Sequence, residues 1–457
     1  MAKLRSVFFC SECGAESPKW IGKCPSCAAW NSYHEEVIEK KSARDEQPKP
    51  WKDAVREKPV PKKLEEVSSL NTLRRDTGDA ELNRVLGGGL VAGSVILVGG
   101  QPGIGKSTLM LQLALRLGTR VLYVSGEESE EQIKMRSDRI GIQNPQCFVF
   151  TDINVNHILR EASRLAPEAL VIDSVQTLVS PHIESTAGSI SQVRECTGEL
   201  QRFAKETGIP VFIIGHITKE GGLAGPKLLE HMVDVVLQFE GDQHYMYRIL
   251  RTQKNRFGST DEIGIYAMES HGLREISNPS ELLISPDDMA LSGSAVAASV
   301  EGLRPLLIET QALVSPAIYG TPQRSATGFD LRRMSMLLAV LEKRCGLPFG
   351  QQDVFLNIAG GIKATDPSID LAVVAALISS LQDIHLSKKI CFAGEVGLSG
   401  EIRPVSRVEQ RIQEAGRLGF ETIYISRYKA DVLSGKDLSI DVRMVSRIDQ
   451  LLEEVFG

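Results

Sequence analysis

A phosphate-binding loop is the feature that most constrains how this chain can fold. Residues 100–107 read GQPGIGKS and match the pattern GxxxxGK[ST], which needs a buried strand before it and a helix after it. Both neighbours are present, because the apolar run SVILVG at 94–99 precedes the loop and the segment TLMLQLALRL follows it. The chain is therefore predicted to contain an α/β domain that binds a nucleoside triphosphate.

The chemistry of this loop assigns roles to its residues. Glycines let backbone N–H groups surround the phosphates, Lys106 reaches the β and γ phosphates, and Ser107 is a ligand for Mg²⁺. ATP and Mg²⁺ are the implied ligands. The predicted nucleotide-binding residues are Gly100, Gln101, Pro102, Gly103, Ile104, Gly105, Lys106, Ser107 and Thr108.

Carboxylates end two of the strands that follow. The run ALVIDS brings Asp173 to a strand end, where it is predicted to help hold Mg²⁺, although an aspartate there also commonly caps a helix. Glu127 and Glu128 end the strand RVLYVSG. We predict Glu127 as the base that activates water, with Glu128 as its rival. Both could instead be first-turn acids of the next helix.

Apolar runs separated by helical segments predict a mostly parallel sheet around the loop. They lie at 94–99, 120–126, 169–174 and 210–216. Two further runs, 233–242 and 244–256, predict an antiparallel hairpin at the sheet edge.

Composition divides the chain of 457 residues into segments. Residues 39–66 hold four prolines and sixteen charged residues with little to bury, which is typical of a linker. A second α/β pattern begins near residue 285, with helices expected at about 329–345 and 367–381. The predicted segments are a zinc finger at 1–38, the linker at 39–66, an ATPase domain at 67–277 and a last domain at 285–457.

Four of the eight cysteines form two Cys-x-x-Cys pairs near the N-terminus, separated by ten residues. This clustering favours a structural Zn²⁺ held by four thiolates, with local disulfides or idle thiols as the alternative. We expect Trp20 and Trp30 to pack on the site. The predicted zinc ligands are Cys10, Cys13, Cys24 and Cys27.

Charge and hydropathy exclude several classes of protein. Lys and Arg number 52 against 58 Asp and Glu, so the net charge of -6 provides no global field for nucleic acid, and any DNA contact must be local. The longest apolar stretch, 371–381, is too short to span a bilayer, and the first residues lack a signal-peptide core. We therefore expect a cytoplasmic protein without a membrane segment.

Several segments together resemble the bacterial RadA (Sms) family of DNA repair proteins, which are RecA-like motors. They are LNRVLGGGLVAGSVILVGGQPGIGKSTLMLQ, YVSGEES, LVIDSVQT and the pentad KNRFG at 254–258. The four-cysteine finger belongs to the same pattern. The resemblance implies a RecA-like P-loop ATPase core, a zinc-ribbon-like N-terminal module and a C-terminal α+β domain like the protease domain of Lon.

The resemblance also implies a function. It predicts a DNA-dependent ATPase, a helicase-like hydrolase of acid anhydrides, that forms hexameric rings and promotes branch migration of RecA-made intermediates in double-strand break repair. The implied partners are single-stranded and branched DNA, the RecA recombinase and further copies of the chain. A nucleotide-switched scaffold or signalling ATPase is the alternative.

Two cations of the pentad receive a catalytic role from the resemblance. Relation to ring helicases implies that Lys254 and Arg256 reach into a neighbour's ATP site. The residues alone equally allow a solvated cationic edge on the second hairpin strand.

Two loops are expected to line the pore of such a ring and grip DNA. Residues 180–192 and 219–227 follow the strands that carry Asp173 and His216. Ordinary connecting loops would look similar. His216 is interpreted either as a sensor of the γ-phosphate or as a buried histidine.

The last domain resembles Lon in the segments GEVGLSGEIRPV and DPSID. Ser368 matches the serine of the Ser-Lys dyad, whereas Glu409 stands at the lysine position. A carboxylate cannot replace a neutral amine as the base, so we predict no proteolysis.

Overall fold

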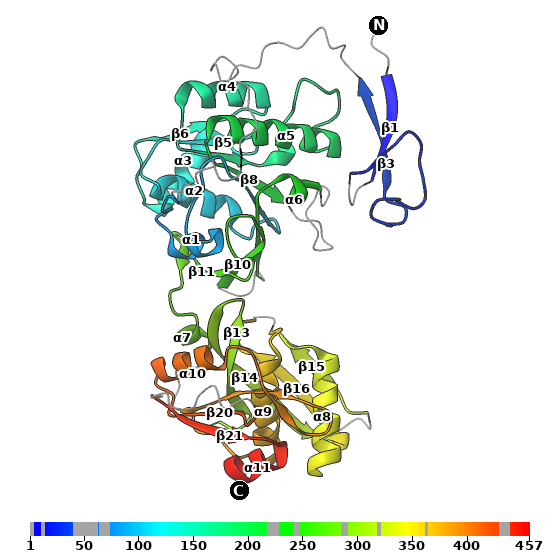
Figure 1. The fold of residues 1–457 in the computed structure, drawn as a ribbon, viewed down its shortest axis with the longest axis vertical. Coiled ribbons are helices and arrows are strands. Elements are labelled where there is room, and N and C mark those ends of the chain that lie inside the picture. The colour runs from blue at the N-terminus through cyan, green and yellow to red at the C-terminus, as the bar shows by residue number, and fades with distance from the viewer. Residues whose placement is uncertain are drawn as a thin grey trace. The chain divides into compact units, whose positions relative to one another are not determined.

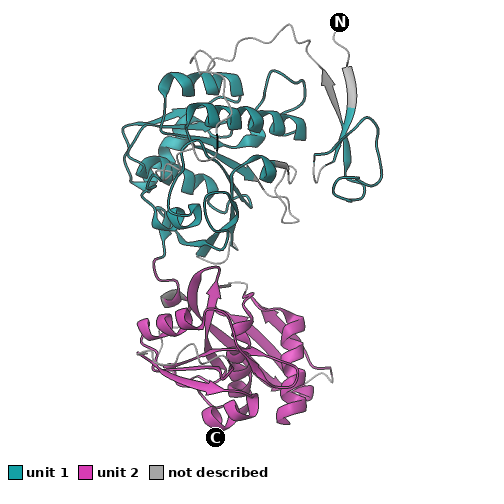
Figure 2. Cartoon of the chain, viewed as in Figure 1, with its two compact units in different colours: residues 1–276 teal, residues 277–457 magenta. Residues whose placement is uncertain are grey.

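The computed structural model divides the chain into two compact units, residues 1–276 and 277–457 (Figures 1 and 2). The structure describes residues 4–10, 14–39, 63, 74–216, 228–241, 247–284, 291–317, 321–361, 364–428 and 439–457. In these ranges, no helix is both long and apolar enough to cross a membrane.

The N-terminal residues form a small antiparallel sheet in the order β2-β1-β3. Its strands are β1 (Leu4–Cys10), β2 (Glu16–Ser17) and β3 (Tyr33–Glu39). Its buried apolar residues are few: Cys10, Cys24 and Tyr33 form one cluster, and Val7 and Phe9 of β1 are also buried. So little apolar burial cannot hold a fold of this size without a metal or another cross-link.

The rest of unit 1 is built on a nine-stranded sheet in the order β12-β11-β10-β9-β4-β8-β7-β5-β6. Six strands from β9 to β6 in this order are parallel, and β10, β11 and β12 run antiparallel. The strands are β4 (Val95–Gly100), β5 (Val121–Ser125), β6 (Cys147–Phe150), β7 (Ala169–Asp173), β8 (Val211–His216), β9 (Val235–Glu240), β10 (Tyr247–Asn255), β11 (Ile263–Glu269) and β12 (Gly272–Glu275).

The hairpin expected at the sheet edge instead lies inside the sheet. Strand β9 pairs in parallel with the central strand β4, and β11 and β12 continue the sheet beyond β10. The apolar run of β9 is buried, which fits this internal position. The sequence of the hairpin indicates that its two strands pair, but not that later strands extend the sheet beyond them.

Helices cover both faces of the nine-stranded sheet (Figure 1). Alternate residues of β4 point to opposite faces, so Ile96 and Val98 join a core with α1 and α2, while Val95 and Leu97 join a core with α4 and α5. The helices are α1 (Ala80–Leu86), α2 (Lys106–Arg116), α3 (Glu130–Ile140), α4 (Val155–Leu165), the 3₁₀ turn η3 (Val175–Thr177), α5 (Ile190–Thr207) and α6 (Leu228–Met232).

Unit 2 is a seven-stranded mixed sheet in the order β15-β16-β14-β13-β17-β20-β21, beside a short β18-β19 pair. Helix α9 (Asp370–Gln382) is apolar on all sides, as expected for a helix buried at the centre of a domain. The strands are β13 (Ser294–Glu301), β14 (Arg304–Pro316), β15 (Arg324–Thr327), β16 (Gln352–Ile358), β17 (Ile390–Ala393), β18 (Glu395–Val396), β19 (Ile402–Arg403), β20 (Thr422–Ser426) and β21 (Asp441–Val445). The other helices are α7 (Ser280–Leu283), α8 (Leu331–Cys345), η4 (Phe349–Gln351), η5 (Ala359–Gly361), η6 (Pro367–Ile369), α10 (Val408–Arg417) and α11 (Ile448–Phe456).

Candidate nucleotide-binding and metal sites

The phosphate loop connects the central strand β4 to α2. Gly103 and Gly105 have φ angles of 75° and 116°, which favour glycine. A Cβ on Gly105 would also lie 2.7 Å from the Cε of Met268, so that side chain would have to move to admit one. No side chain caps α2, so the N–H groups of its first turn, which includes Ser107 and Thr108, remain for an anion.

Lys106 lies inside this loop, with its ammonium bound to the loop's own backbone. Its Nζ donates to the carbonyl oxygens of Gly100 at 2.8 Å and Gln101 at 2.9 Å. Burial lowers the pKa of Lys106 to about 8, against the opposing charges of Asp173 and Glu127. Three of the residues predicted to act on ATP, Lys106, Asp173 and Glu127, therefore lie in one electrostatic cluster.

Asp173 ends β7 beside the end of β5, and a buried tyrosine holds its carboxylate. The hydroxyl of Tyr123 donates to Asp173 Oδ2 at 2.7 Å. Burial raises the pKa of Tyr123 well above its usual value, so the hydroxyl keeps its proton and remains a donor. Tyr123 was not among the predicted site residues; the available signal is a phenol hydroxyl in the middle of the apolar strand VLYVS.

The two rival glutamates have different partners. Glu127 Oε1 accepts a hydrogen bond of 2.5 Å from the Oγ of Ser174. Glu128 instead forms an ion pair with Arg136 of α3. Burial raises the pKa of Glu128, and the positive charge of Arg136 opposes that shift.

The interpretation of these glutamates as first-turn acids is wrong. Helix α3 begins at Glu130 and its N-cap is Ser129, so both glutamates lie before the helix. The N–H groups of Glu127 and Glu128 both point to the Oγ of Ser125, at 3.3 and 3.0 Å. Ser125 and Ser174, which the sequence analysis missed, thus shape the loop from two strands.

These groups together fit a nucleoside triphosphate with a divalent cation. The uncapped N–H groups of α2 and the ammonium of Lys106 are donors for phosphate oxygens. The hydroxyl of Ser107 and the carboxylate of Asp173 are oxygen ligands of the kind that Mg²⁺ prefers.

The pentad at 254–258 is bound throughout to its own chain. Lys254 Nζ donates to the carbonyl oxygens of Glu230 at 2.6 Å and Val233 at 2.8 Å, at the end of α6. Burial lowers the pKa of Lys254, and the nearby charge of Arg256 lowers it further. The Cα of Gly87 lies 2.9 Å from where a Cβ of Gly258 would stand, so the pentad packs closely on the glycine run after α1.

Arg256 lies at the opposite edge of the sheet from its own phosphate loop. Its Nη1 is 3.3 Å from Asp234 Oδ1, and Asp234 Oδ2 accepts from the N–H of Val95, the first residue of β4. The phosphate loop starts at the other end of β4, about 17 Å away for a six-residue strand at 3.3 Å per residue. Arg256 therefore cannot contact a phosphate bound by its own chain.

The two expected pore loops differ in what the structure describes. Residues 219–227 lie outside the described residues, as does the side chain of His216, whose backbone pairs with Gly100 at the start of the phosphate loop. In the segment 180–192, Gln192 Nε2 donates to the carbonyls of Ile183 at 3.1 Å and Ser185 at 3.0 Å, so α5 holds the loop.

Three predicted zinc ligands come together in the N-terminal sheet. The thiol sulfurs of Cys10, Cys24 and Cys27 lie within 4.8 Å of one another, and Cys13 is outside the described residues. Cys10 and Cys27 Sγ are 3.6 Å apart, close to the spacing of about 3.8 Å that Zn–S bonds near 2.3 Å require. The hydroxyl of Ser32 lies 3.1 Å from Cys10 Sγ, where it can hydrogen-bond to a thiolate. This set fits a tetrahedral metal ion.

The two tryptophans beside the second knuckle do not pack on the thiols. Trp20 and Trp30 are 52% and 70% exposed, so the expectation that they cover the site is wrong.

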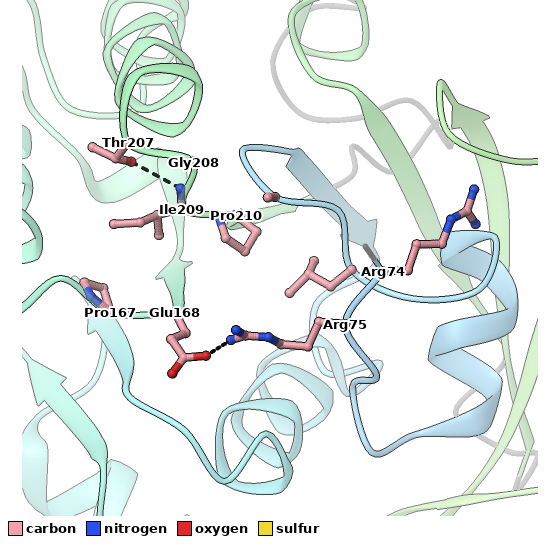
Figure 3. A pocket seen from close by; sticks show the side chains of 10 residues that line it. Arg74, Arg75, Pro167, Glu168, Thr207, Gly208, Ile209 and Pro210 are labelled. Atoms are coloured by element: carbon pink, nitrogen blue, oxygen red, sulfur yellow. Dashed lines mark hydrogen bonds and ion pairs between the residues drawn. The ribbon is translucent and has the colours of Figure 1, made fainter. Parts of the chain in front are cut away.

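A cavity of about 460 Å³ opens at the edge of the sheet opposite the phosphate loop (Figure 3). Its lining includes Glu168, which precedes β7, and Ile209 and Pro210, which precede β8. An ion pair between Arg75 and Glu168 lies within it. Because the starts of β7 and β8 line it, this cavity is separate from the nucleotide site.

Comparison with known proteins identifies the family. DNA repair protein RadA of Bacillus subtilis is 49% identical over 460 residues, covering 100% of both chains. The RadA of Streptococcus pyogenes serotype M1 is 49% identical over 463 residues with the same coverage, and that of Listeria monocytogenes is 48% identical over 432 residues, 93% of each chain. This chain belongs to the RadA family of DNA repair proteins.

Family models agree with this membership. An AAA domain matches residues 61–222, a rubredoxin metal-binding domain matches 8–35, and subunit ChlI of Mg-chelatase matches 310–428. The chain therefore has a RecA-like P-loop ATPase core between a zinc ribbon and a Lon-like α+β domain. A crystal structure of the RadB recombinase aligns with 44% of this chain and 99% of its own, with a TM-score of 0.36 and 22% identity.

The Lon-like domain contains a buried arginine where a protease would need a base. Arg411 Nη1 lies 2.6 Å from the Oγ of Ser368, whereas sequence matching had placed Glu409 at the lysine position. Arg411 is 1% exposed and pairs with Asp366 at 2.6 Å. A guanidinium does not lose its proton in proteins, so it cannot activate the hydroxyl. The geometry thus supports the prediction of no proteolysis, but because an arginine contacts Ser368 and not because a glutamate replaces the lysine.

Proposed function

We propose that this chain is a DNA-dependent ATPase and helicase-like motor that promotes branch migration of RecA-made intermediates in double-strand break repair. Membership in the RadA family and the cluster of Lys106, Glu127 and Asp173 support this proposal. It includes ATP, Mg²⁺ and a structural Zn²⁺, and single-stranded DNA, branched DNA and RecA as partners. It also includes a hexameric ring in the cytoplasm.

In the proposed reaction, Glu127 accepts a proton from a water molecule that attacks the γ-phosphorus of ATP. The bond to the bridging oxygen breaks, and ADP and phosphate leave. Backbone N–H groups of α2 and Lys106 bind the phosphate oxygens. Ser107 and Asp173 would hold Mg²⁺, whose charge neutralises the phosphates. Ser174 and Tyr123 orient the two carboxylates through their hydrogen bonds.

The position of Arg256 is the observation that carries the proposed ring. Because Arg256 lies beside Asp234 at the start of β4, and its own phosphate loop follows the other end of this strand of about 17 Å, a role in hydrolysis requires a second copy of the chain. Head-to-tail contacts that close on themselves give rings, and an arginine supplied by a neighbour is worth about 10³-fold or more in rate. DNA bound in the ring would then be coupled to turnover at the interfaces.

Subunit mixing tests this arrangement. Lys106→Ala and Arg256→Ala should each hydrolyse ATP about 10³-fold more slowly than the parent protein with single-stranded DNA. In an equal mixture, about a quarter of the interfaces join an intact phosphate loop to an intact arginine, so ATP hydrolysis should partly recover. Lys205→Ala is the matched control, because Lys205 Nζ also pairs with Asp234, at 2.6 Å, and is not assigned to the reaction.

Two results would contradict the proposal. An Arg256→Ala protein with normal turnover in assembled rings removes the trans role of that arginine. Hydrolysis that single-stranded DNA does not stimulate, at either low or moderate salt, removes the DNA motor and favours the nucleotide-switched scaffold.

A further inference from the structure

Two tryptophans of the zinc ribbon are exposed. Trp20 is 52% exposed and Trp30 is 70% exposed. Among the described residues of the ribbon, they are the exposed large apolar side chains. Tryptophan buries a large area when it finds a partner, so two such rings left in water indicate a contact that forms on binding.

Both rings lie on the same hairpin, around Lys23. Lys23 and Trp30 are paired by an antiparallel bridge, and Lys23 Nζ is 5.4 Å from the centroid of the Trp30 ring. The ring of Trp20 lies against Gly22, with its Cη2 3.7 Å from where a Cβ of Gly22 would stand. The N–H of Asn31 donates to the carbonyl of Gly22 at 2.8 Å, which links the two ends of the surface. We call Trp20, Lys23 and Trp30 the tryptophan surface.

Two lysines lie within the segment that carries the two tryptophans. Residues 17–34 contain two lysines, Lys19 and Lys23, and no acidic residue, although the whole chain has a net charge of -6. The two lysines offset the formal charge of about -2 that four thiolates and one Zn²⁺ would carry, and Glu16, Glu35 and Glu36 lie outside the segment on β2 and β3. Charge alone therefore provides little attraction for a phosphate backbone, and we expect the stacking of the rings to carry most of the contact.

We propose that the tryptophan surface binds unpaired nucleotides of single-stranded DNA, with bases stacked on the two rings and Lys19 and Lys23 beside the phosphates. The combination of exposed aromatic rings and cations is typical of proteins that hold single strands without reading their sequence. This inference rests on the proposed function, because it names where the motor first holds its DNA.

Intrinsic fluorescence of the full chain tests the proposal directly. The sequence has three tryptophans, at positions 20, 30 and 51, so Trp51→Phe leaves only those of the tryptophan surface. Oligothymidine added to this protein should quench the fluorescence, whereas a duplex of the same length should quench it much less. Trp20→Ala and Trp30→Ala should each weaken oligothymidine binding by roughly five- to a hundredfold.

Matched variants separate stacking from folding. Trp30→Phe keeps an aromatic ring and should retain most of the affinity measured by anisotropy of a labelled oligothymidine. Every variant should keep as much bound zinc as the parent, because neither ring covers the thiols. Lys19→Gln with Lys23→Gln should reduce the salt dependence of binding.

The outcomes distinguish this inference from the function on which it rests. If the alanine variants bind oligothymidine as tightly as the parent while retaining zinc, the tryptophan surface is not the DNA contact. The same conclusion follows if only an added protein, and not DNA, changes the fluorescence. If the parent itself neither binds oligothymidine nor hydrolyses ATP faster with it, the proposed DNA motor fails as well.

Discussion

The Oγ of Ser174 donates a hydrogen bond of 2.5 Å to the Oε1 of Glu127. Ser174 directly follows Asp173, so this bond ties the loop after β5 to the end of the neighbouring strand β7. It holds one carboxylate beside the residue predicted to bind Mg²⁺ and beside Lys106, on which its charge acts. A carboxylate held in this way can serve as the base for an attacking water.

Replacing the two glutamates should have different effects on ATP hydrolysis. Glu127→Gln should lower kcat by about 10²- to 10⁴-fold and leave ATP binding nearly unchanged, because the amide keeps the shape but cannot accept the proton. Glu128→Gln weakens its ion pair with Arg136 and should change kcat much less. Steady-state hydrolysis and binding of a fluorescent ATP analogue measure the two quantities. A larger loss of kcat in Glu128→Gln would reverse the assignment.

ATP binding should weaken at alkaline pH because of Lys106. Burial lowers the pKa of its ammonium to about 8 in the nucleotide-free protein, and only the protonated form attracts the phosphates. The dissociation constant for ATP should therefore rise by about tenfold between pH values of about 7 and 9. Titrations with a fluorescent ATP analogue at each pH measure this rise.

Lys106→Arg is the control for the pH dependence. Its guanidinium stays charged across the whole range, so its affinity for ATP, even if lower, should vary little with pH. Parallel curves for the two proteins would show that another group, or ATP itself, causes the change.

Removing one thiolate should unfold the zinc ribbon. Cys27→Ser leaves an incomplete ligand set, and metal binding is expected to supply on the order of 10 kcal/mol to a module with so small a core. The parent should contain one zinc ion per chain and the variant much less, as measured by a metallochromic dye after denaturation. Hydrogen exchange should accelerate in residues 14–39, with Cys147→Ser as a control far from the ribbon in sequence. Full zinc content in Cys27→Ser would contradict the site.

The buried arginine of the Lon-like domain should contribute stability and no proteolysis. Arg411→Ala leaves Asp366 buried without its ion pair, which typically costs about 3 to 5 kcal/mol. Ser368→Ala removes only one hydroxyl partner and should cost about 1 to 3 kcal/mol. Hydrogen exchange of peptides from η6 and α10 reports the local loss. Casein should remain intact with all three proteins, and cleavage that depends on Ser368 would overturn the argument.

Much of the nucleotide site could be predicted because its parts are contiguous. The loop GQPGIGKS carries its glycines, lysine and serine within eight residues, and the strand and helix that it requires flank it directly. The cysteine pairs are equally local. The sequence could also predict that Asp173 and Glu127 lie near the loop. The apolar runs indicate parallel strands, and parallel strands end at the same side of their sheet.

Relationships between distant residues depended on the tertiary structure. Strand order decides that β9 lies inside the sheet. The pairing of Asp234 with the start of β4 decides that Arg256 and its own phosphate loop lie at opposite ends of that strand. Packing decides that Glu128 meets Arg136 and Glu127 meets Ser174, although the two glutamates are adjacent in the chain. It likewise brings Arg411 rather than Glu409 to Ser368. A residue pattern specifies local conformation, but the pairing of side chains far apart in sequence is settled only when the whole core packs in one register.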